Sequence, residues 1–306
     1  MNGDKLPERL IKKATKLRFD PLDETLKETL DTLSLAIKKC NYLDDQEFLK
    51  SRKDFFQTFK THFSVLAFNI NGLSKKKEEF ETFLDTLQFN FDVIGLTETH
   101  LNTVTEKYTS LRDYKSYFQS RDKNSWGGIA IFIQPYLTCV RRHDLELQEE
   151  GIIESLFIEI SDKGKSTIVG VIYRPPSSNA ALFSSKIHEI LSKVKGQQVH
   201  LMGDFNLDLL KYHQHQATGD FLSNMSLLGL HPTISLPTRI TPTSATIIDN
   251  IFTTDFYRPI SSGLLVTDIS DHLPIFCFFG ETGFHEKQNP IYILKRDFSQ
   301  KKQREI

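Results

Sequence analysis

The sequence predicts an α+β fold in which mixed β-sheets are covered by helices on the outside. From about residue 62, short apolar runs alternate with longer amphipathic segments, as in chains that contain both strands and helices. Some apolar runs follow one another directly and others are separated by helical segments, so both antiparallel and parallel pairing are expected. The chain has 306 residues and 39% hydrophobic content, which is enough to bury a large core.

The first 61 residues lack strand-like runs and are predicted to form a helical N-terminal arm. Apolar side chains recur at alternating steps of four and three residues from Leu26 to Cys40, the spacing of an amphipathic helix. The pattern is shorter than a sustained heptad series, so a helix that packs on its own domain is favoured over a coiled-coil partner. A second helical stretch over residues 44–63 has Asp44 or Asp45 as a candidate N-cap.

Residues 62–280 are predicted to form the main domain. Helices are expected near residues 75–89, 180–195 and 216–228, and Gly229 ends the last of them. Residues 281–306 carry scattered lysines and arginines and are expected to be a linker-like tail. Strands are expected at residues 64–68, 92–96, 127–133, 154–160, 167–173, 199–203, 246–254, 263–267 and 274–279.

Charge and cysteine content exclude several classes of protein. The 38 basic and 39 acidic residues give a net charge of -1, so binding to a polyanion requires a local basic patch. The three cysteines are far apart in the chain, which argues against a disulfide framework and for a reducing compartment. No apolar run approaches the roughly 20 residues of a membrane span, so we expect an intracellular protein with no membrane partner.

Polar residues recur at the points where predicted strands stop. Taken singly, an Asn or Asp in such a place is usually a turn residue, and a lone His is usually a packing residue. Taken together, they supply oxygen ligands without cysteine, which favours Mg²⁺ or Mn²⁺ over zinc. A metal ion beside a histidine suits hydrolysis at phosphorus. The residues are Asn69, Asn71, Glu98, Tyr173, Arg174, Asp204, Asn206, Asp249, Asn250, Ser270, Asp271 and His272.

The order of these motifs resembles the endonuclease/exonuclease/phosphatase superfamily across residues 62–280. The series runs N-x-N-G-L, x-E-T, Y-x-P, G-D-F-N, I-D-N and S-D-H-x-P-I. The stretches "GLTETHL", "VIYRPPSS", "LMGDFNLDLL" and "DISDHLPIF" are similar to the apurinic-type endonuclease domain that precedes the reverse transcriptase in non-LTR (LINE-like) retrotransposons. The resemblance implies a four-layer α/β sandwich, with two mixed sheets face to face and helices outside, and a site at one edge.

The resemblance also implies roles for individual residues. Glu98 is the expected principal Mg²⁺ ligand, with Asn69 beside it and Asp271 near the metal. Asp204 would take the proton from the attacking water, and Asn206 would hold that water or the phosphate. These residues form the expected metal and nucleophile half of the site.

The phosphate half is expected to centre on His272. Asp249 would keep its imidazole cationic, because a neighbouring carboxylate raises the pKa of a histidine. Tyr173 would orient the scissile phosphate, and Arg174 beside it is placed to contact DNA backbone. The remaining candidates for substrate binding are Asn71 and a supporting polar position matched by Ser244 or Thr246.

The sequence departs from the motifs of repair endonucleases at two positions. Repair endonucleases carry Asp at the position of Asn71 and Trp at that of Phe68, whereas retrotransposon relatives commonly have Asn at the first, so nicking is favoured over abasic-site repair. Trp126 is expected to pack at the start of a strand, with base stacking as the alternative.

The expected function is Mg²⁺-dependent hydrolysis of a phosphodiester, with DNA nicked on one strand to leave a 3′-hydroxyl, and nuclear residence follows from that substrate. One alternative is the same fold acting on a phosphoinositide, sphingomyelin or RNA. Another is a non-catalytic remnant that binds DNA or protein. No reverse transcriptase follows before Ile306, so we expect a fragment or truncated copy, a reverse transcriptase encoded elsewhere, or a host gene that kept the nuclease alone.

Overall fold

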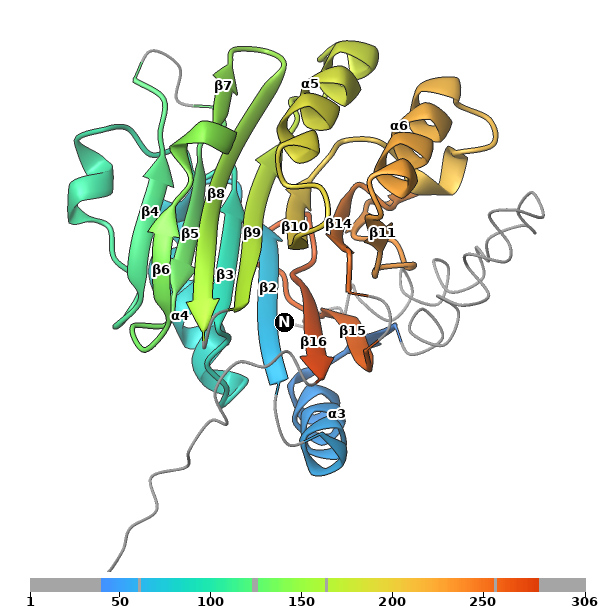
Figure 1. Cartoon of the computed structure of the whole chain (residues 1–306). Coiled ribbons are helices and arrows are strands. Elements are labelled where there is room, and N and C mark those ends of the chain that lie inside the picture. Colours follow the sequence, from blue (N-terminus) through green and yellow to red (C-terminus); the bar gives the residue numbers. More distant parts are fainter. Residues whose placement is uncertain (1–39, 60–61, 123–125, 163–164, 256–257, 281–306) are drawn as a thin grey trace, which may run out of the picture.

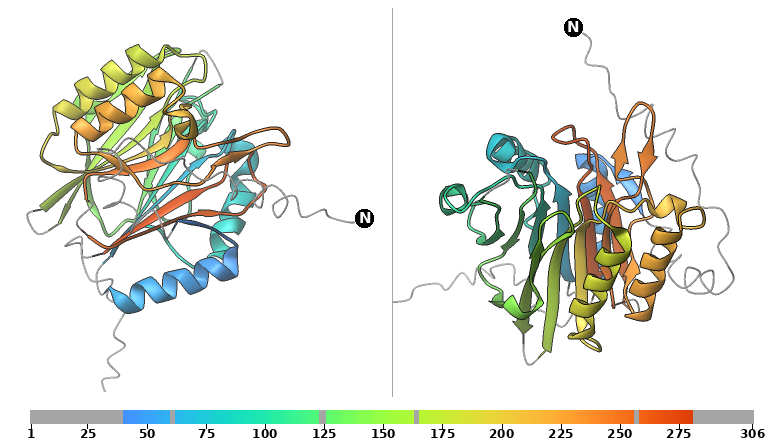
Figure 2. Two further views of the ribbon diagram at one scale, coloured as in Figure 1. Left: turned by 90° about the vertical axis from the view of Figure 1, so that its right-hand side faces the viewer. Right: turned by 90° about the horizontal axis from the view of Figure 1, so that it is seen from above.

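The computed structural model describes residues 40–59, 62–122, 126–162, 165–255 and 258–280. Two seven-stranded sheets face each other, and helices cover the outer face of each (Figures 1 and 2). Strands β2 (His62–Asn69) and β3 (Val93–Thr97) run parallel, as do β9 (Lys165–Tyr173) and β10 (Gln198–Asp204), whereas most other pairs are antiparallel. The predicted four-layer sandwich with mixed sheets is therefore confirmed.

The first sheet has the strand order β1-β15-β16-β2-β3-β5-β4. Its strands are β1 (Asn41–Leu43), β15 (Ile260–Leu265), β16 (Ile275–Gly280), β2 (His62–Asn69), β3 (Val93–Thr97), β5 (Ile129–Ile133) and β4 (Lys115–Gln119). Helices α3 (Asp45–Thr58) and α4 (Leu73–Thr86) pack on its outer face through aromatic and leucine side chains.

The second sheet has the order β11-β14-β10-β9-β8-β6, and β7 pairs with β8. Its strands are β11 (His231–Pro232), β14 (Asp249–Thr253), β10 (Gln198–Asp204), β9 (Lys165–Tyr173), β8 (Ile153–Asp162), β6 (Thr138–Arg141) and β7 (Leu147–Glu149). Helices α5 (Ala180–Ser192) and α6 (Gln216–Leu227) lie side by side on its outer face (Figure 2).

Short elements complete the described part of the chain. A two-stranded hairpin of β12 (Arg239–Ile240) and β13 (Ala245–Thr246) stands apart from both sheets. Three single-turn 3₁₀ helices are η1 (Thr105–Tyr108), η2 (His143–Leu145) and η3 (Leu209–Lys211). Among the described residues, no helix has both the length and the apolar character needed to cross a bilayer.

The central core lies between the two sheets, so the central strands are buried on both faces. In β2, Val65 and Ala67 face the opposite sheet while Leu66 and Phe68 face α4, which explains why the run is continuously apolar rather than alternating. The sheets approach closely at Gly95 of β3, where a Cβ atom would lie 2.5 Å from Val171 and 2.8 Å from the Met202 sulfur. A larger residue there would push the sheets apart.

Residues 40–59 pack on this sandwich. Asp44 caps α3 by accepting a hydrogen bond from the Glu47 amide at 2.8 Å, and the Glu47 side chain accepts in return from the Asp44 amide. Phe48 and Phe55 of α3 enter the core on the outer face of the first sheet, and β1 extends that sheet next to β15. The amphipathic pattern of residues 26–39 lies outside the described residues.

Every predicted strand and the three predicted helices of the main domain are present, within a few residues of the expected bounds. The sequence pattern does not indicate β1, β4, β6, β7 or the short pieces β11–β13. These strands are short or contain several polar residues, and most lie at sheet edges or in a separate hairpin.

Candidate active site

The candidate residues meet at one edge of the sandwich because several strands end there. Parallel pairing sets the end of β2 at Asn69 beside the end of β3 at Thr97, directly before Glu98. In the facing sheet, Asp204 at the end of β10 pairs with Tyr173 of β9 on one side and with Asp249 of β14 on the other. Each sheet thus delivers polar side chains to the same edge.

A glycine is required immediately before Asp204. Gly203 has φ of +142°, and a Cβ atom built there would lie 1.9 Å from the carbonyl oxygen of Ile172. Only a residue without a side chain allows β10 to continue against β9 up to Asp204. The glycine of the G-D-F-N motif is therefore structural, and it fixes where the following carboxylate points.

The turn after β10 is held by Asn206, which has φ of +47°. Its amide N–H donates to Asp204 Oδ1 at 2.9 Å, and its Nδ2 donates to Asp204 Oδ2 at 3.1 Å. Arg174 donates through Nη1 to the Asn206 carbonyl at 2.9 Å, and its guanidinium also reaches the carbonyl of Ser178. Arg174 is buried, so in this structure its charge stabilises the turn from within the protein.

Asn69 connects the two sheets across the site. Its Nδ2 donates to Glu98 Oε1 at 2.9 Å and to Asp204 Oδ2 at 2.8 Å. Its Oδ1 is buried, and none of the described residues donates a hydrogen bond to it. An unsatisfied buried carbonyl oxygen is costly, so this atom is available to a ligand that enters the site.

Asp204 is a buried carboxyl group with a perturbed pKa. Burial, reinforced by the nearby carboxylate of Asp249, raises the pKa of Asp204 to about 7, although His272 and the donors from Asn69 and Asn206 oppose this shift. A carboxyl group with a pKa near neutrality can exchange a proton at physiological pH. Asp204 therefore has the properties of a general base.

His272, Asp249 and Thr238 form a buried chain of hydrogen bonds. His272 Nδ1 lies 2.8 Å from Asp249 Oδ2, and the Thr238 hydroxyl donates to the same oxygen at 2.6 Å. Burial alone would lower the pKa of His272, but the charge and hydrogen bond of Asp249 outweigh it and raise the pKa to about 9. The imidazole is therefore cationic at neutral pH.

Nothing in the sequence marks Thr238 as a member of this chain of hydrogen bonds. The candidates for a supporting polar position were Ser244 and Thr246. Ser244 lies in the exposed turn between β12 and β13, where its hydroxyl contacts Thr241 at 2.8 Å, and the Thr246 carbonyl accepts from the Thr238 amide at 2.9 Å. The only available signal was that Thr238 precedes the hairpin in the stretch "PTRITPTSATIIDN".

Glu98 lies between several hydrogen-bond donors. Burial would raise the pKa of Glu98, but the neighbouring His100, the hydrogen bond from Asn69, the charge of His272 and the nearby Tyr173 lower it overall. His100 Nε2 lies 3.5 Å from Glu98 Oε2, a contact that the sequence analysis did not predict. Glu98 is thus held as a carboxylate that faces Asn69 on one side and His100 on the other.

The side chains present fit a divalent metal ion. Oxygen atoms of Asp204 and Asp249 lie within 4.8 Å of each other and of a ring nitrogen of His272, which is protonated at neutral pH and is therefore not itself a ligand. Glu98 and the unpaired Oδ1 of Asn69 add further oxygen atoms next to this group. A donor set rich in carboxylate and carbonyl oxygen is the kind that hard cations prefer.

Two other candidates lie at the margin of this group. Asp271 is exposed and accepts from the Arg239 guanidinium, with the Arg239 Nη2 atom 2.7 Å from Asp271 Oδ2. Burial would raise the pKa of Asp271, but His272 and Arg239 lower it overall. Asn71 is exposed on the turn after β2, with φ of +48°.

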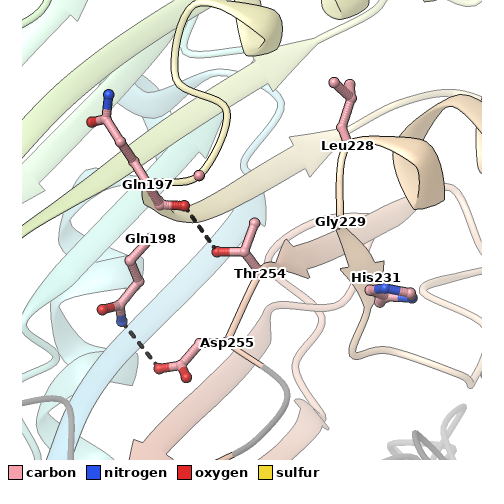
Figure 3. A pocket seen from close by; sticks show the side chains of 8 residues that line it. Gln197, Gln198, Leu228, Gly229, His231, Thr254 and Asp255 are labelled. Atoms are coloured by element: carbon pink, nitrogen blue, oxygen red, sulfur yellow. Dashed lines mark hydrogen bonds between the residues drawn. The ribbon is translucent and has the colours of Figure 1, made fainter.

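A separate pocket of about 440 Å³ lies at the opposite end of β10 (Figure 3). Gln198 donates to Asp255 Oδ2 at 3.1 Å and the Thr254 hydroxyl donates to the Gln197 carbonyl at 3.4 Å, so its walls are bonded to one another. Gln198 begins the strand that Asp204 ends, a separation of roughly 20 Å at ~3.3 Å per residue. None of the clustered site residues lines this pocket.

Part of the chain is similar in sequence to a protein of a mobile element. A stretch of 148 residues, 46% of this chain, is 28% identical to a probable RNA-directed DNA polymerase from transposon BS of Drosophila melanogaster. That stretch spans only 15% of the length of the relative.

Solved structures share the fold. The endonuclease domain of TRAS1, a telomere-specific non-LTR retrotransposon, superimposes with a TM-score of 0.57 and 16% identity, covering 72% of this chain and 99% of that one. The AP endonuclease LMAP from Leishmania major gives a TM-score of 0.58 and 13% identity over 75% of this chain and 90% of that one. Residues 66–272 match the Endonuclease/Exonuclease/phosphatase family over more than half of the sequence, and the chain belongs to that family.

Proposed function

We propose that this protein is a Mg²⁺-dependent endonuclease of retrotransposon origin that nicks one strand of DNA and leaves a 3′-hydroxyl. The observation that carries the proposal is the meeting of Glu98, Asn69 and Asp204 with the His272–Asp249 pair at one edge of the sandwich. Phosphodiester hydrolysis needs a base, a cationic group for the phosphate and a Lewis acid. Residue types suited to all three are present together.

The protein's own groups have complementary tasks in this reaction. Asp204 accepts the proton of the attacking water, for which a pKa of about 7 is suitable. Asn206 orients that water or the phosphate, since its side chain already contacts Asp204. His272 donates to the phosphate and stabilises the negative charge that develops there.

The metal ion would be held by Glu98, with Asn69 Oδ1 and the neighbouring carboxylates available to complete the site. When bound, it polarises the phosphate and stabilises the leaving oxygen. Tyr173, whose pKa is raised by burial and by the nearby charge of Glu98, orients the scissile phosphate beside that carboxylate. In this proposal Arg174 acts indirectly, because its guanidinium holds the turn that carries Asn206.

DNA is the proposed substrate because the chain shares its fold with the endonuclease domain of a non-LTR retrotransposon and with an AP endonuclease, and because part of its sequence is similar to a transposon RNA-directed DNA polymerase. Nuclear residence and association with a reverse transcriptase are part of the same proposal. All the proposed catalytic groups lie within residues 62–280, and residues 40–59 contribute a strand and a helix that pack on this domain.

A plasmid assay tests the proposal. The purified chain is incubated with supercoiled plasmid and Mg²⁺, and nicked circles are compared with those from Asp204→Ala and from Asp220→Ala, an exposed control on α6. We expect nicking by the wild type and the control only, with ends that a DNA polymerase extends directly. Absence of nicking above the Asp204→Ala background contradicts the proposal.

The same assay distinguishes the alternatives. Preferential hydrolysis of a phosphoinositide, sphingomyelin or RNA favours a different substrate for this fold. Salt-sensitive DNA binding without cleavage favours a non-catalytic remnant.

A further inference from the structure

The sole tryptophan of the chain, Trp126, is exposed rather than packed at the start of β5. Its exposed fraction is 68%. The sequence had favoured packing at this position. Tryptophan is highly buried on average, so a solvent-facing indole beside a catalytic edge requires an explanation.

The loop that carries Trp126 is anchored on both sides of the indole. Arg121 pairs with the buried carboxylate of Glu154, which also accepts from the Gly128 amide at 2.8 Å. The Gly127 carbonyl accepts from the His100 amide at 2.8 Å. These contacts tie Arg121, Gly127 and Gly128, the described residues on either side of Trp126, to β8 and to the segment that follows Glu98.

The indole lies one side chain away from the candidate metal ligand. The ring centroids of Trp126 and His100 are 5.4 Å apart, with an interplanar angle of 72°, an edge-to-face arrangement. On its other side, His100 Nε2 is 3.5 Å from Glu98 Oε2. Glu98, His100 and Trp126 therefore form a row that leads from the site to the surface.

The neighbouring loop adds further exposed apolar side chains. Val104 is 63% exposed and Tyr108 is 85% exposed. Both belong to the segment after His100, which is bonded to the Trp126 loop because Thr103 donates to Asp122 and the Arg121 amide donates to the Leu101 carbonyl. Both loops next to Glu98 thus present large apolar side chains to solvent.

We propose that Trp126 is a stacking platform for a nucleobase that has left the helical stack, next to the phosphate held at the active site. The inference rests on the proposed function, because it takes the polymer at that site to be DNA. An aromatic face stacks on any base, whereas a fully stacked duplex offers no free base face. The platform therefore selects for unpaired or distorted DNA rather than for sequence.

His100 acts as a positioning residue for this platform. Its imidazole lies between the indole and Glu98, so it fixes the orientation of the ring relative to the carboxylate. The nucleotide whose base stacks on Trp126 is consequently close in the strand to the phosphate that is cut.

The single tryptophan makes the test direct, because all intrinsic tryptophan fluorescence comes from Trp126. The inactive Asp204→Ala protein is titrated with a duplex that contains three unpaired nucleotides and with the fully paired duplex. We expect quenching by the first DNA, with the same midpoint as binding measured by fluorescence anisotropy of a labelled strand.

Variants of the otherwise wild-type chain complete the test. Trp126→Ala should weaken affinity for the unpaired DNA by roughly 5- to 150-fold and raise KM with little change in kcat, whereas Trp126→Phe should retain most of the affinity. Leu227→Ala is the matched control, since Leu227 is also exposed, at 74%, but lies on α6. It should change neither affinity nor KM.

Two results overturn the inference while leaving the proposed function intact. One is nicking and binding with no change in tryptophan fluorescence. The other is unchanged affinity and KM in Trp126→Ala. Conversely, quenching by unpaired DNA without any nicking supports the platform and contradicts the nuclease, and absence of DNA binding contradicts both.

Discussion

Replacing Asp249 with asparagine isolates the effect of one negative charge on His272. The Asp249 Oδ2 atom accepts from both His272 Nδ1 and the Thr238 hydroxyl. An asparagine carbonyl oxygen in the same place accepts both hydrogen bonds, so Asp249→Asn retains the geometry and removes the charge. The opposing effect of burial then weighs more, and we expect the pKa of His272 to fall toward its ordinary value of 6.5, although the charges of Asp204 and Asp271 still raise it.

The size of the effect follows from the two pKa values. His272 is 5% exposed, and its pKa is raised from 6.5 to about 9. At 1.36 kcal/mol per pH unit, this difference corresponds to about 3 kcal/mol of folding free energy. Because the folded pKa is the higher one, the stabilisation is fully present below pH 6.5 and is lost as the pH rises through about 9.

Urea denaturation of both proteins in EDTA, at several pH values from about 6 to about 9.5, measures this quantity. The difference in unfolding free energy between wild type and Asp249→Asn should shrink by about 3 kcal/mol across that range. Groups whose pKa does not depend on Asp249 cancel in the difference, whereas Asp204, whose pKa is raised by Asp249, changes the difference in the same direction as His272. A difference that stays constant with pH refutes the reasoning. Under the proposed function, kcat should also fall by roughly 10²-fold.

Three further predictions concern the same edge of the sandwich. Thr238→Val should lower the unfolding free energy by about 1–3 kcal/mol in a urea titration, because Asp249 loses a buried hydrogen-bond donor. Thr238→Ser keeps the hydroxyl and should be close to wild type. Equal losses of unfolding free energy in both variants contradict this prediction. Gly203→Ala should prevent stable folding, because the added Cβ would lie 1.9 Å from the Ile172 carbonyl oxygen. The expected readout is the loss of a cooperative thermal transition in circular dichroism. A melting curve like that of the wild type contradicts this prediction. Saturating Mg²⁺ or Mn²⁺ should raise Tm, with a stabilisation of about 2.7 kcal/mol at 100 times Kd. Asn69→Ala should reduce that gain, and a Tm that does not respond to metal in the wild type argues against the site.

Strand direction explains why the candidate residues lie at one edge of the sandwich, an edge that the sequence implied only through its resemblance to the family. Runs such as residues 199–203 are apolar on both faces and end in a carboxylate, and the carboxyl ends of parallel strands lie at the same edge of a sheet. Strands such as β4 were not predicted from the sequence, because "KSYFQ" lacks a clear alternation of apolar and polar residues. β4 forms a strand through its antiparallel pairing with β5, and this pairing is not encoded in the residues of β4 themselves.

The hydrogen-bond partners of the site residues were harder to predict than the positions of these residues at strand ends. Arg174 follows a strand beside Tyr173 in the sequence, and nothing local indicates that its guanidinium turns inward to the carbonyls of Asn206 and Ser178. Thr238 reaches Asp249 because the chain leaves the sheet after β11 and returns at β14. A contact made by such an excursion depends on the path of the loop, which residue spacing does not specify.

The electrostatics of the site connect its proton chemistry to its metal chemistry. The carboxyl groups of Glu98, Asp204 and Asp249 lie close to the imidazole of His272. This group of side chains therefore contains more acidic than basic residues. In the protein alone, Asp204 relieves this imbalance by holding a proton up to about pH 7. A divalent cation relieves it instead by attraction, which favours the ionised form of Asp204. Proton and metal thus compensate the same charge, so a cation that enters this edge would also convert Asp204 into the form that can accept a proton from water.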